Sequence, residues 1–164
     1  MPAIRLFVID VDGTLLTPAK QLTERAVRAV QRLRDAHVEV ALTSGRPPRG
    51  MRMLIEPLGI TTPLCAFNGG MFVAPSLGVL EERTIPPEAA HQVVALLARH
   101  GLDVWVYRGA DWYITNLSAP HVDIEQSTVR FAPTVVQDLH GVLDHAVKIV
   151  GVSDDHDGLA RCEA

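Results

Sequence analysis

Two aspartates lie two positions apart in a glycine-containing turn near the start of the chain. The turn reads Asp10-Val11-Asp12-Gly13-Thr14 and follows a short apolar run. Gly13 permits a sharp curl, which would direct both carboxylates into one site. One carboxylate can attack phosphorus and form an aspartyl phosphate, while the other gives a proton to the leaving oxygen and later takes one from water. The pair therefore suits the hydrolysis of a phosphate ester.

Two later turns have chemistry that matches the first. Each follows an apolar run, and they read Thr43-Ser44-Gly45-Arg46-Pro47 and Asn68-Gly69-Gly70. The Ser44 hydroxyl and the backbone N–H groups beside it can hold phosphoryl oxygens. Because two carboxylates repel a phosphate, the site needs a hard cation, and oxygen ligands with phosphate chemistry point to Mg²⁺.

Each turn also has a structural interpretation when it is taken alone. Asp-x-Asp-Gly is common in turns and calcium loops, but an EF-hand counted from Asp10 needs glutamate at its twelfth position, where this chain has Gln21. Thr-Ser-Gly-Arg is also typical of a turn that starts a helix, and Asn-Gly-Gly of a hairpin turn. The occurrence of all three, in order and each after an apolar run, favours a phosphate site.

The three turns must be positioned by the elements that precede them. Apolar runs at 4–9, 38–42 and 63–67 are typical of strands buried on both faces, and helical periodicity follows at 23–34 and 51–58. Strand–helix–strand alternation predicts a parallel sheet with right-handed crossovers. Ligands bind outside the carboxyl ends of such strands, so the three turns should meet at one edge.

After residue 70 the pattern changes to hairpins and helices. We expect a hairpin at 71–83, a helix over 86–100, an antiparallel pair at 102–115, a strand at 146–152 and a helix from 155. The expected fold class is α/β: a partial Rossmann-like core of parallel strands, followed by an incomplete α+β cap. The domains would be residues 1–83 and residues 84–164.

Composition limits the function classes and the partners. The 164 residues carry a formal net charge of −4, and the absence of a clustered basic face argues against nucleic acid. No apolar run approaches the roughly 18 residues of a membrane span. Cys65 and Cys162 form no disulfide framework or metal-ligand spacing, which favours the cytoplasm, and the apolar run around Cys65 favours a buried thiol.

The motifs together resemble a known family. Residues 8–16, Val-Ile-Asp-Val-Asp-Gly-Thr-Leu-Leu, resemble the first motif of the haloacid dehalogenase superfamily. Residues 40–47 and 68–70 are similar to the Thr-Gly-Arg-Pro and Asn-Gly-Ala segments of its Cof-type, sugar-phosphatase-like branch, which carries a C2B cap. The resemblance implies a Mg²⁺-dependent phosphatase of small phosphorylated metabolites, most of all sugar phosphates.

The resemblance also implies a role for each site residue. Asp10 would be the nucleophile and a magnesium ligand, and Asp12 the general acid and base, with its backbone carbonyl on the metal. Ser44 would bind the phosphoryl group, with Thr43 as the adjacent fallback. The expected phosphate- and substrate-binding residues are Gly13, Thr14, Ser44, Gly45, Arg46, Asn68 and Gly69.

This sequence departs from the family in its second half. The family has a lysine as its third motif and a Gly-Asp-x-x-Asn-Asp type fourth motif. Of the two lysines here, Lys20 is too early and Lys148 lies in a predicted cap strand. We therefore expect that the chain holds only the first two motifs, ends inside the cap and is nearly inactive alone.

A half core would expose an apolar sheet edge. Such an edge predicts either a homodimer or pairing with a missing C-terminal half. The alternative function is a catalytically incomplete domain that binds only phosphate or a partner chain.

Overall fold

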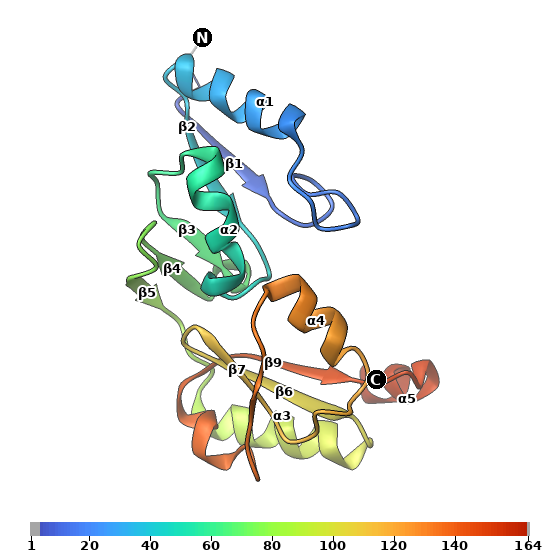
Figure 1. Cartoon of the computed structure of the whole chain (residues 1–164). Helices are drawn as coiled ribbons and strands as arrows, with labels where there is room; N and C mark the ends of the chain where they lie inside the picture. Colours follow the sequence, from blue (N-terminus) through green and yellow to red (C-terminus); the bar gives the residue numbers. More distant parts are fainter. Residues whose placement is uncertain (1–3, 164) are drawn as a thin grey trace. The chain divides into compact units, whose positions relative to one another are not determined.

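The structure is a computed structural model that describes residues 4–163, and the chain divides into two compact units between Glu82 and Arg83. Figure 1 shows the order of their elements. Each unit has its own sheet, one of five strands and one of four. None of the helices described within residues 4–163 has the length and apolar character needed to cross a bilayer.

The first unit is built on the five-stranded sheet, which has the order β1-β2-β3-β4-β5. Its first three strands are parallel, and β4 and β5 join them as an antiparallel hairpin. The parallel α/β core that the alternation predicted is confirmed. The strands are β1 (Leu6–Asp10), β2 (Glu39–Thr43), β3 (Leu64–Ala66), β4 (Met71–Val73) and β5 (Val79–Glu82).

Two helices connect the parallel strands. The helix α1 (Glu24–Asp35) begins after Thr23, whose hydroxyl accepts a 3.1 Å hydrogen bond from the Ala26 N–H. The helix α2 (Pro48–Leu58) begins three residues before the expected 51, so that expectation was wrong. Pro48 is its first residue, where the fixed φ of proline suits a helix and its missing N–H removes no bond.

The third strand is shorter than its apolar run suggests. β3 ends at Ala66, and Phe67 opens a 3₁₀ turn, η1 (Phe67–Gly69), with a φ of 52°. Cys65 is half-buried, not buried, because side chains along β3 alternate between the two faces of the sheet. The order of strand and turn is as expected, but the turn begins one residue earlier.

The second unit has a four-stranded sheet of order β8-β7-β6-β9. The antiparallel pair and the later strand match the sequence expectations within one residue at each end. The elements are α3 (Pro87–Arg99), β6 (Asp103–Arg108), β7 (Asp111–Ile114), α4 (Val122–Val129), β8 (Thr134–Val135), η2 (His140–His145), β9 (Ala146–Val152) and α5 (His156–Glu163).

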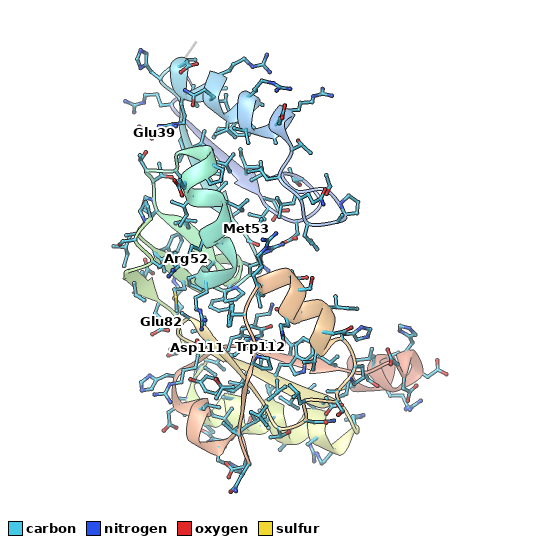
Figure 2. All side chains as sticks on the ribbon, in the orientation of Figure 1. Glu39, Arg52, Met53, Glu82, Asp111 and Trp112 are labelled. Carbon is cyan, nitrogen blue, oxygen red and sulfur yellow. The ribbon has the colours of Figure 1, made fainter. Side chains whose placement is uncertain are left out.

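The two faces of the second sheet differ in chemistry. On one face Val104 and Val106 pack with Ala90 of α3 and Leu143 of η2 in an apolar cluster. On the other face the ring centroids of Trp105 and Trp112 lie 5.2 Å apart in an edge-to-face arrangement. Trp112, which is labelled in Figure 2, is fully buried.

Candidate active site

The first predicted turn lies beside the second because their strands are neighbours. Asp10 ends β1 and pairs in register with Thr43, the last residue of β2. Neighbouring strands lie about 4.8 Å apart, so the two turns leave the sheet at the same edge. Asp10 is exposed there. The structure therefore brings together the first two of the three predicted motifs at the carboxyl ends of β1 and β2.

The turn after Asp10 curls back on itself. Val11 is fully buried, and its carbonyl accepts hydrogen bonds from the N–H groups of Leu15 and Leu16 at 3.1 and 2.9 Å. Gly13 has a φ of 80°, which favours glycine because a side chain would be strained there. Thr14 is exposed. The curl that Gly13 was expected to permit is present.

Asp12 is held by two cations. The Arg46 guanidinium donates from Nε and Nη2 to the two carboxylate oxygens at 2.7 and 2.8 Å, and the Lys20 ammonium donates at 2.8 Å. Hydrogen bonds from Arg46 lower the pKa of the Asp12 carboxyl to about 2; partial burial opposes this shift and the bond from Lys20 adds to it. In this arrangement the carboxyl group is ionised at neutral pH, and its orientation is fixed.

The second turn is organised around Ser44. Its hydroxyl oxygen accepts a 3.1 Å bond from the Arg46 N–H, and the side chain is 1% exposed. Accepting this bond leaves the hydroxyl hydrogen available for another acceptor. Arg46 also donates from Nη1 to the Gly50 carbonyl at 3.2 Å. The bidentate pair with Asp12 thus ties the first turn to the second.

The third turn is bonded to the second through the backbone. The Asn68 N–H donates to the Ser44 carbonyl at 2.8 Å, and the Phe67 N–H to the Arg46 carbonyl at 3.1 Å. Phe67, Asn68 and Gly69 all have positive φ, of 52°, 54° and 102°. This conformation is costly for a residue as bulky as phenylalanine, and it persists only where surrounding contacts enforce it. The three predicted turns are thus joined by hydrogen bonds through Asp12, Ser44, Arg46 and Asn68.

Oxygen ligands for a metal are few in these turns. Within residues 4–163 no cluster of three or more His, Cys, Asp or Glu side chains could hold a metal ion. Mg²⁺, however, usually keeps several waters and takes one or two carboxylates together with substrate phosphate oxygens. The Asp10 carboxylate and the Asp12 backbone carbonyl fit that pattern, whereas the Asp12 carboxylate is already bonded to Arg46 and Lys20.

Sequence reasoning missed Lys20, which it had judged too early in the chain. The signal that could have found it is the short turn 17–20, which returns the chain to the Asp12 segment. The Lys20 N–H donates to the Thr17 carbonyl at 2.8 Å, and Leu16 pairs with Leu22 across the hairpin.

The second unit holds a polar cluster that the sequence also did not reveal. The Tyr107 hydroxyl donates to the Glu125 carboxylate at 2.6 Å, and the Lys148 ammonium lies 5.1 Å from the Tyr107 ring centroid. Burial raises the pKa of the Tyr107 hydroxyl and lowers the pKa of the Lys148 ammonium. Trp105 Nε1 is buried with no hydrogen-bond partner among the described residues.

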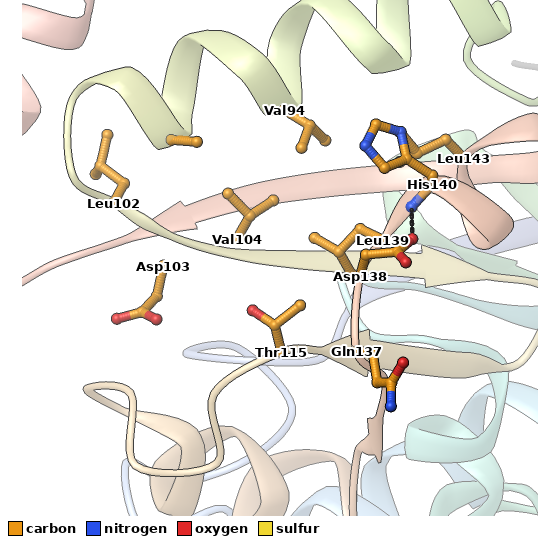
Figure 3. A pocket seen from close by; sticks show the side chains of 11 residues that line it. Val94, Leu102, Asp103, Val104, Thr115, Gln137, Asp138, Leu139, His140 and Leu143 are labelled. Carbon is orange, nitrogen blue, oxygen red and sulfur yellow. Dashed lines mark hydrogen bonds between the residues drawn. The ribbon is translucent and has the colours of Figure 1, made fainter.

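A cavity of about 330 Å³ also lies in the second unit (Figure 3). Its lining includes the apolar residues Val94, Leu102 and Leu139 and the polar residues Asp138 and His140. None of the predicted site residues lines it.

Comparison with known proteins agrees with the motifs and the fold. A family model described as haloacid dehalogenase-like hydrolase matches residues 7–164. An HMP-PP phosphatase of Cronobacter sakazakii is 30% identical over 160 residues, which cover 97% of this chain and 57% of that protein. The chain thus spans little more than half the length of this relative.

Solved structures share the fold. A haloacid dehalogenase-like hydrolase from Bacteroides thetaiotaomicron superposes with a TM-score of 0.85 at 25% identity, covering 98% of this chain and 62% of that one. The HAD subclass IIB sugar phosphatase BT4131 superposes with a TM-score of 0.76 at 16% identity, again over 98% and 62%. The resemblance inferred from the motifs is confirmed, and the chain belongs to the haloacid dehalogenase-like hydrolase family.

Proposed function

We propose that the chain carries the nucleophile of a Mg²⁺-dependent phosphatase of small phosphorylated metabolites, with sugar phosphates as the leading substrate class. One observation carries the proposal: Asp10 stands in register with Thr43, while Asp12 is bonded to Arg46 of the adjacent turn. This arrangement supports the proposal, because the carboxylate proposed as nucleophile, a second carboxylate and the turn proposed to bind phosphate are at one sheet edge. The names of the relatives, an HMP-PP phosphatase and a sugar phosphatase, support the substrate class.

The two carboxylates divide the reaction between them. The Asp10 carboxylate attacks phosphorus, the ester P–O bond breaks, and Asp12 gives its proton to the leaving oxygen. Water then attacks the aspartyl phosphate, loses its proton to Asp12 and releases phosphate, which restores Asp10. Since Asp12 is ionised while it is bonded to Arg46 and Lys20, these bonds must loosen and the carboxylate must take up a proton from solvent water before the first turnover; in later turnovers the attacking water supplies that proton.

The binding turns orient the phosphoryl group during both steps. Ser44 offers a hydroxyl hydrogen, and Gly45 lies beside the Asn68 amide, which is 3.4 Å from where a Cβ on Gly45 would be. Gly13, Thr14 and Gly69 complete the proposed binding set. Mg²⁺, held by Asp10 and the Asp12 carbonyl, would neutralise phosphoryl charge.

The test is a panel of metabolite phosphates assayed with and without Mg²⁺. It is run on the 164-residue chain and on the full reading frame that contains it. We expect Mg²⁺-dependent release of phosphate from the full frame and almost none from the 164 residues, because these supply few groups that offset phosphoryl charge. If a chelator removes Mg²⁺ and the full frame still releases phosphate at the same rate, the proposal is contradicted. Robust turnover by the 164 residues alone would show that the site is complete without further chain.

A second candidate function rests on the exposed strand β1. This strand is at the sheet edge, and Leu6, Phe7 and Val8 are 53%, 46% and 55% exposed. An apolar groove of about 480 Å³ runs beside it, lined by Phe7, Ile9 and residues of α1. Strands so apolar are normally buried on both faces. The chain would then be an incomplete domain that binds phosphate or a partner chain, either a second copy or the remainder of a core.

Light scattering after size-exclusion chromatography tests the role of β1. We expect Val8→Lys to reduce self-association or capture of the rest of the core, because a charge on an edge strand opposes strand pairing. Leu117→Lys is the matched control, since Leu117 is 59% exposed in a loop of the second unit. A monomeric wild-type chain, together with full-frame protein unaffected by Val8→Lys, would contradict pairing through β1.

A further inference from the structure

A short hairpin after the first turn places one lysine on the catalytic segment. Leu16 pairs with Leu22, the Thr17 N–H donates to the Gln21 carbonyl at 3.1 Å, and the Gln21 N–H donates to the Thr17 hydroxyl at 3.2 Å. Lys20 stands at the tip of this hairpin. Its ammonium reaches back over eight residues to Asp12 at 2.8 Å.

The backbone at Lys20 is unusual for a lysine. Its φ is 57°, a left-handed conformation that glycine or asparagine adopts at lower cost. Residues held in such conformations concentrate at functional sites, where the side chain is worth the strain. A role limited to closing the hairpin would be served better by glycine. His37 and Leu77 share this conformation, so a use for the lysine side chain is inferred from its bond to Asp12.

The charges of the proposed reaction leave a place for one more cation. When the ester first enters, Asp12 is still ionised, so Asp10, Asp12 and a phosphate monoester dianion together bring four negative charges. Mg²⁺ and Arg46 bring three positive charges, and Lys20 brings the fourth. Among the described side chains bonded to Asp12, Arg46 and Lys20 are the cations.

The two cations differ in their freedom to move. The Arg46 side chain is 3% exposed and is fixed by its bidentate bond to Asp12 and its bond to the Gly50 carbonyl. The Lys20 side chain is 38% exposed and reaches Asp12 through one bond. Lysine is a compact charge on a flexible stem, and it serves as a phosphate ligand in other sites. Lys20 is therefore the cation that can change partner.

We infer that Lys20 is a phosphate-binding residue, whose ammonium leaves the Asp12 carboxylate for a phosphoryl oxygen when a phosphate ester enters the site. The inference rests on the proposed function for the identity of the ester, but not for the binding itself. The same movement removes one of the two cations from Asp12.

The experiment is calorimetric titration of the 164-residue chain with inorganic phosphate in the presence of Mg²⁺. Lys20→Met keeps the stem and removes the charge, so phosphate affinity should fall about 10- to 100-fold, the worth of a charged hydrogen bond. Lys20→Arg should restore it to within about threefold of wild type. Arg28→Met is the matched control, since Arg28 is exposed and pairs only locally with Glu24. It changes net charge equally and should alter affinity less than about twofold.

Several results would overturn the inference. These are wild-type affinity in Lys20→Met, an equal loss in Arg28→Met, no recovery in Lys20→Arg, or no measurable phosphate binding by the wild-type chain. An unchanged melting temperature in Lys20→Met shows that a loss of affinity is not a loss of fold. Binding needs no turnover. A chain that binds phosphate through Lys20 but hydrolyses nothing in its full frame would therefore refute the proposed function alone.

Discussion

Asp10→Asn is expected to abolish phosphate-ester hydrolysis, with turnover below about one part in 10⁴ of the wild-type rate. The amide is nearly the same size as the carboxylate but cannot form the aspartyl phosphate. Asp10 is exposed at the end of β1, so the substitution disturbs little packing. The measurement is phosphate release by the full reading frame under saturating substrate and Mg²⁺.

The matched control for this loss is Asp35→Asn. This substitution makes the same chemical change at the last residue of α1. There the Asp35 carboxylate accepts a 2.7 Å hydrogen bond from the Gln31 side chain. Its turnover should stay within about twofold of wild type. A second readout is trapping of the intermediate: acid-quenched wild-type protein should carry labelled phosphate, and Asp10→Asn should carry none. Labelled phosphate on the Asp10→Asn variant would place the nucleophile elsewhere.

Asp12→Asn is expected to slow turnover by about 10²–10⁴, the usual contribution of a positioned acid or base. The asparagine amide cannot give a proton to the leaving oxygen. The effect should therefore depend on the leaving group. A sugar phosphate, with a basic alkoxide leaving group, should show the full loss, whereas p-nitrophenyl phosphate needs little protonation and should show a smaller one.

The stability of Asp12→Asn must be measured beside its activity. Arg46 is almost fully buried, and the substitution removes the Asp12 carboxylate from its guanidinium; loss of one partner of a buried ion pair destabilises folded proteins. We expect a lower midpoint of urea unfolding at pH 7. In wild type the lowered pKa of Asp12 stabilises the fold above about pH 4, and this stability is lost as the pH falls through about 2. The urea midpoints of wild type and Asp12→Asn should therefore converge at low pH.

The two substrates separate proton transfer from orientation. Equal losses of turnover on the sugar phosphate and on p-nitrophenyl phosphate would indicate that Asp12 orients groups without transferring a proton.

Much of the first unit could be predicted because local signals agree with the final packing. The apolar runs, the cap at Thr23 and the glycine after α2 each identified an element boundary. The register of Asp10 against Thr43 was not predicted, but it agrees with the expectation that the turns meet at one edge of the sheet. The start of α2 was missed because Pro47 and Pro48 are typical of a turn as well as of a first helical turn.

The rest depended on contacts distant in sequence. The helix α4 has eight residues, is flanked by the left-handed cap residues His121 and Arg130, and has no side-chain cap. The strand β8 has two residues, paired with β7. Neither element is long enough to show a periodic hydrophobic pattern in the sequence. The Lys20–Asp12 bond was hidden for a different reason, because a hairpin and not a periodic element brings the two residues together.

The charges at the two ends of β1 have a consequence for the protein while it is being made. Arg5 and Asp10 flank the apolar stretch Leu6–Ile9, and β1 leaves the ribosome before β2, the strand with which it pairs. Flanking charges of this kind act as gatekeepers, because they oppose the stacking of bare apolar strands from neighbouring nascent chains. The residue proposed to attack phosphorus would thus also keep newly synthesised chains apart. Selection on solubility and selection on catalysis would then act on the same carboxylate.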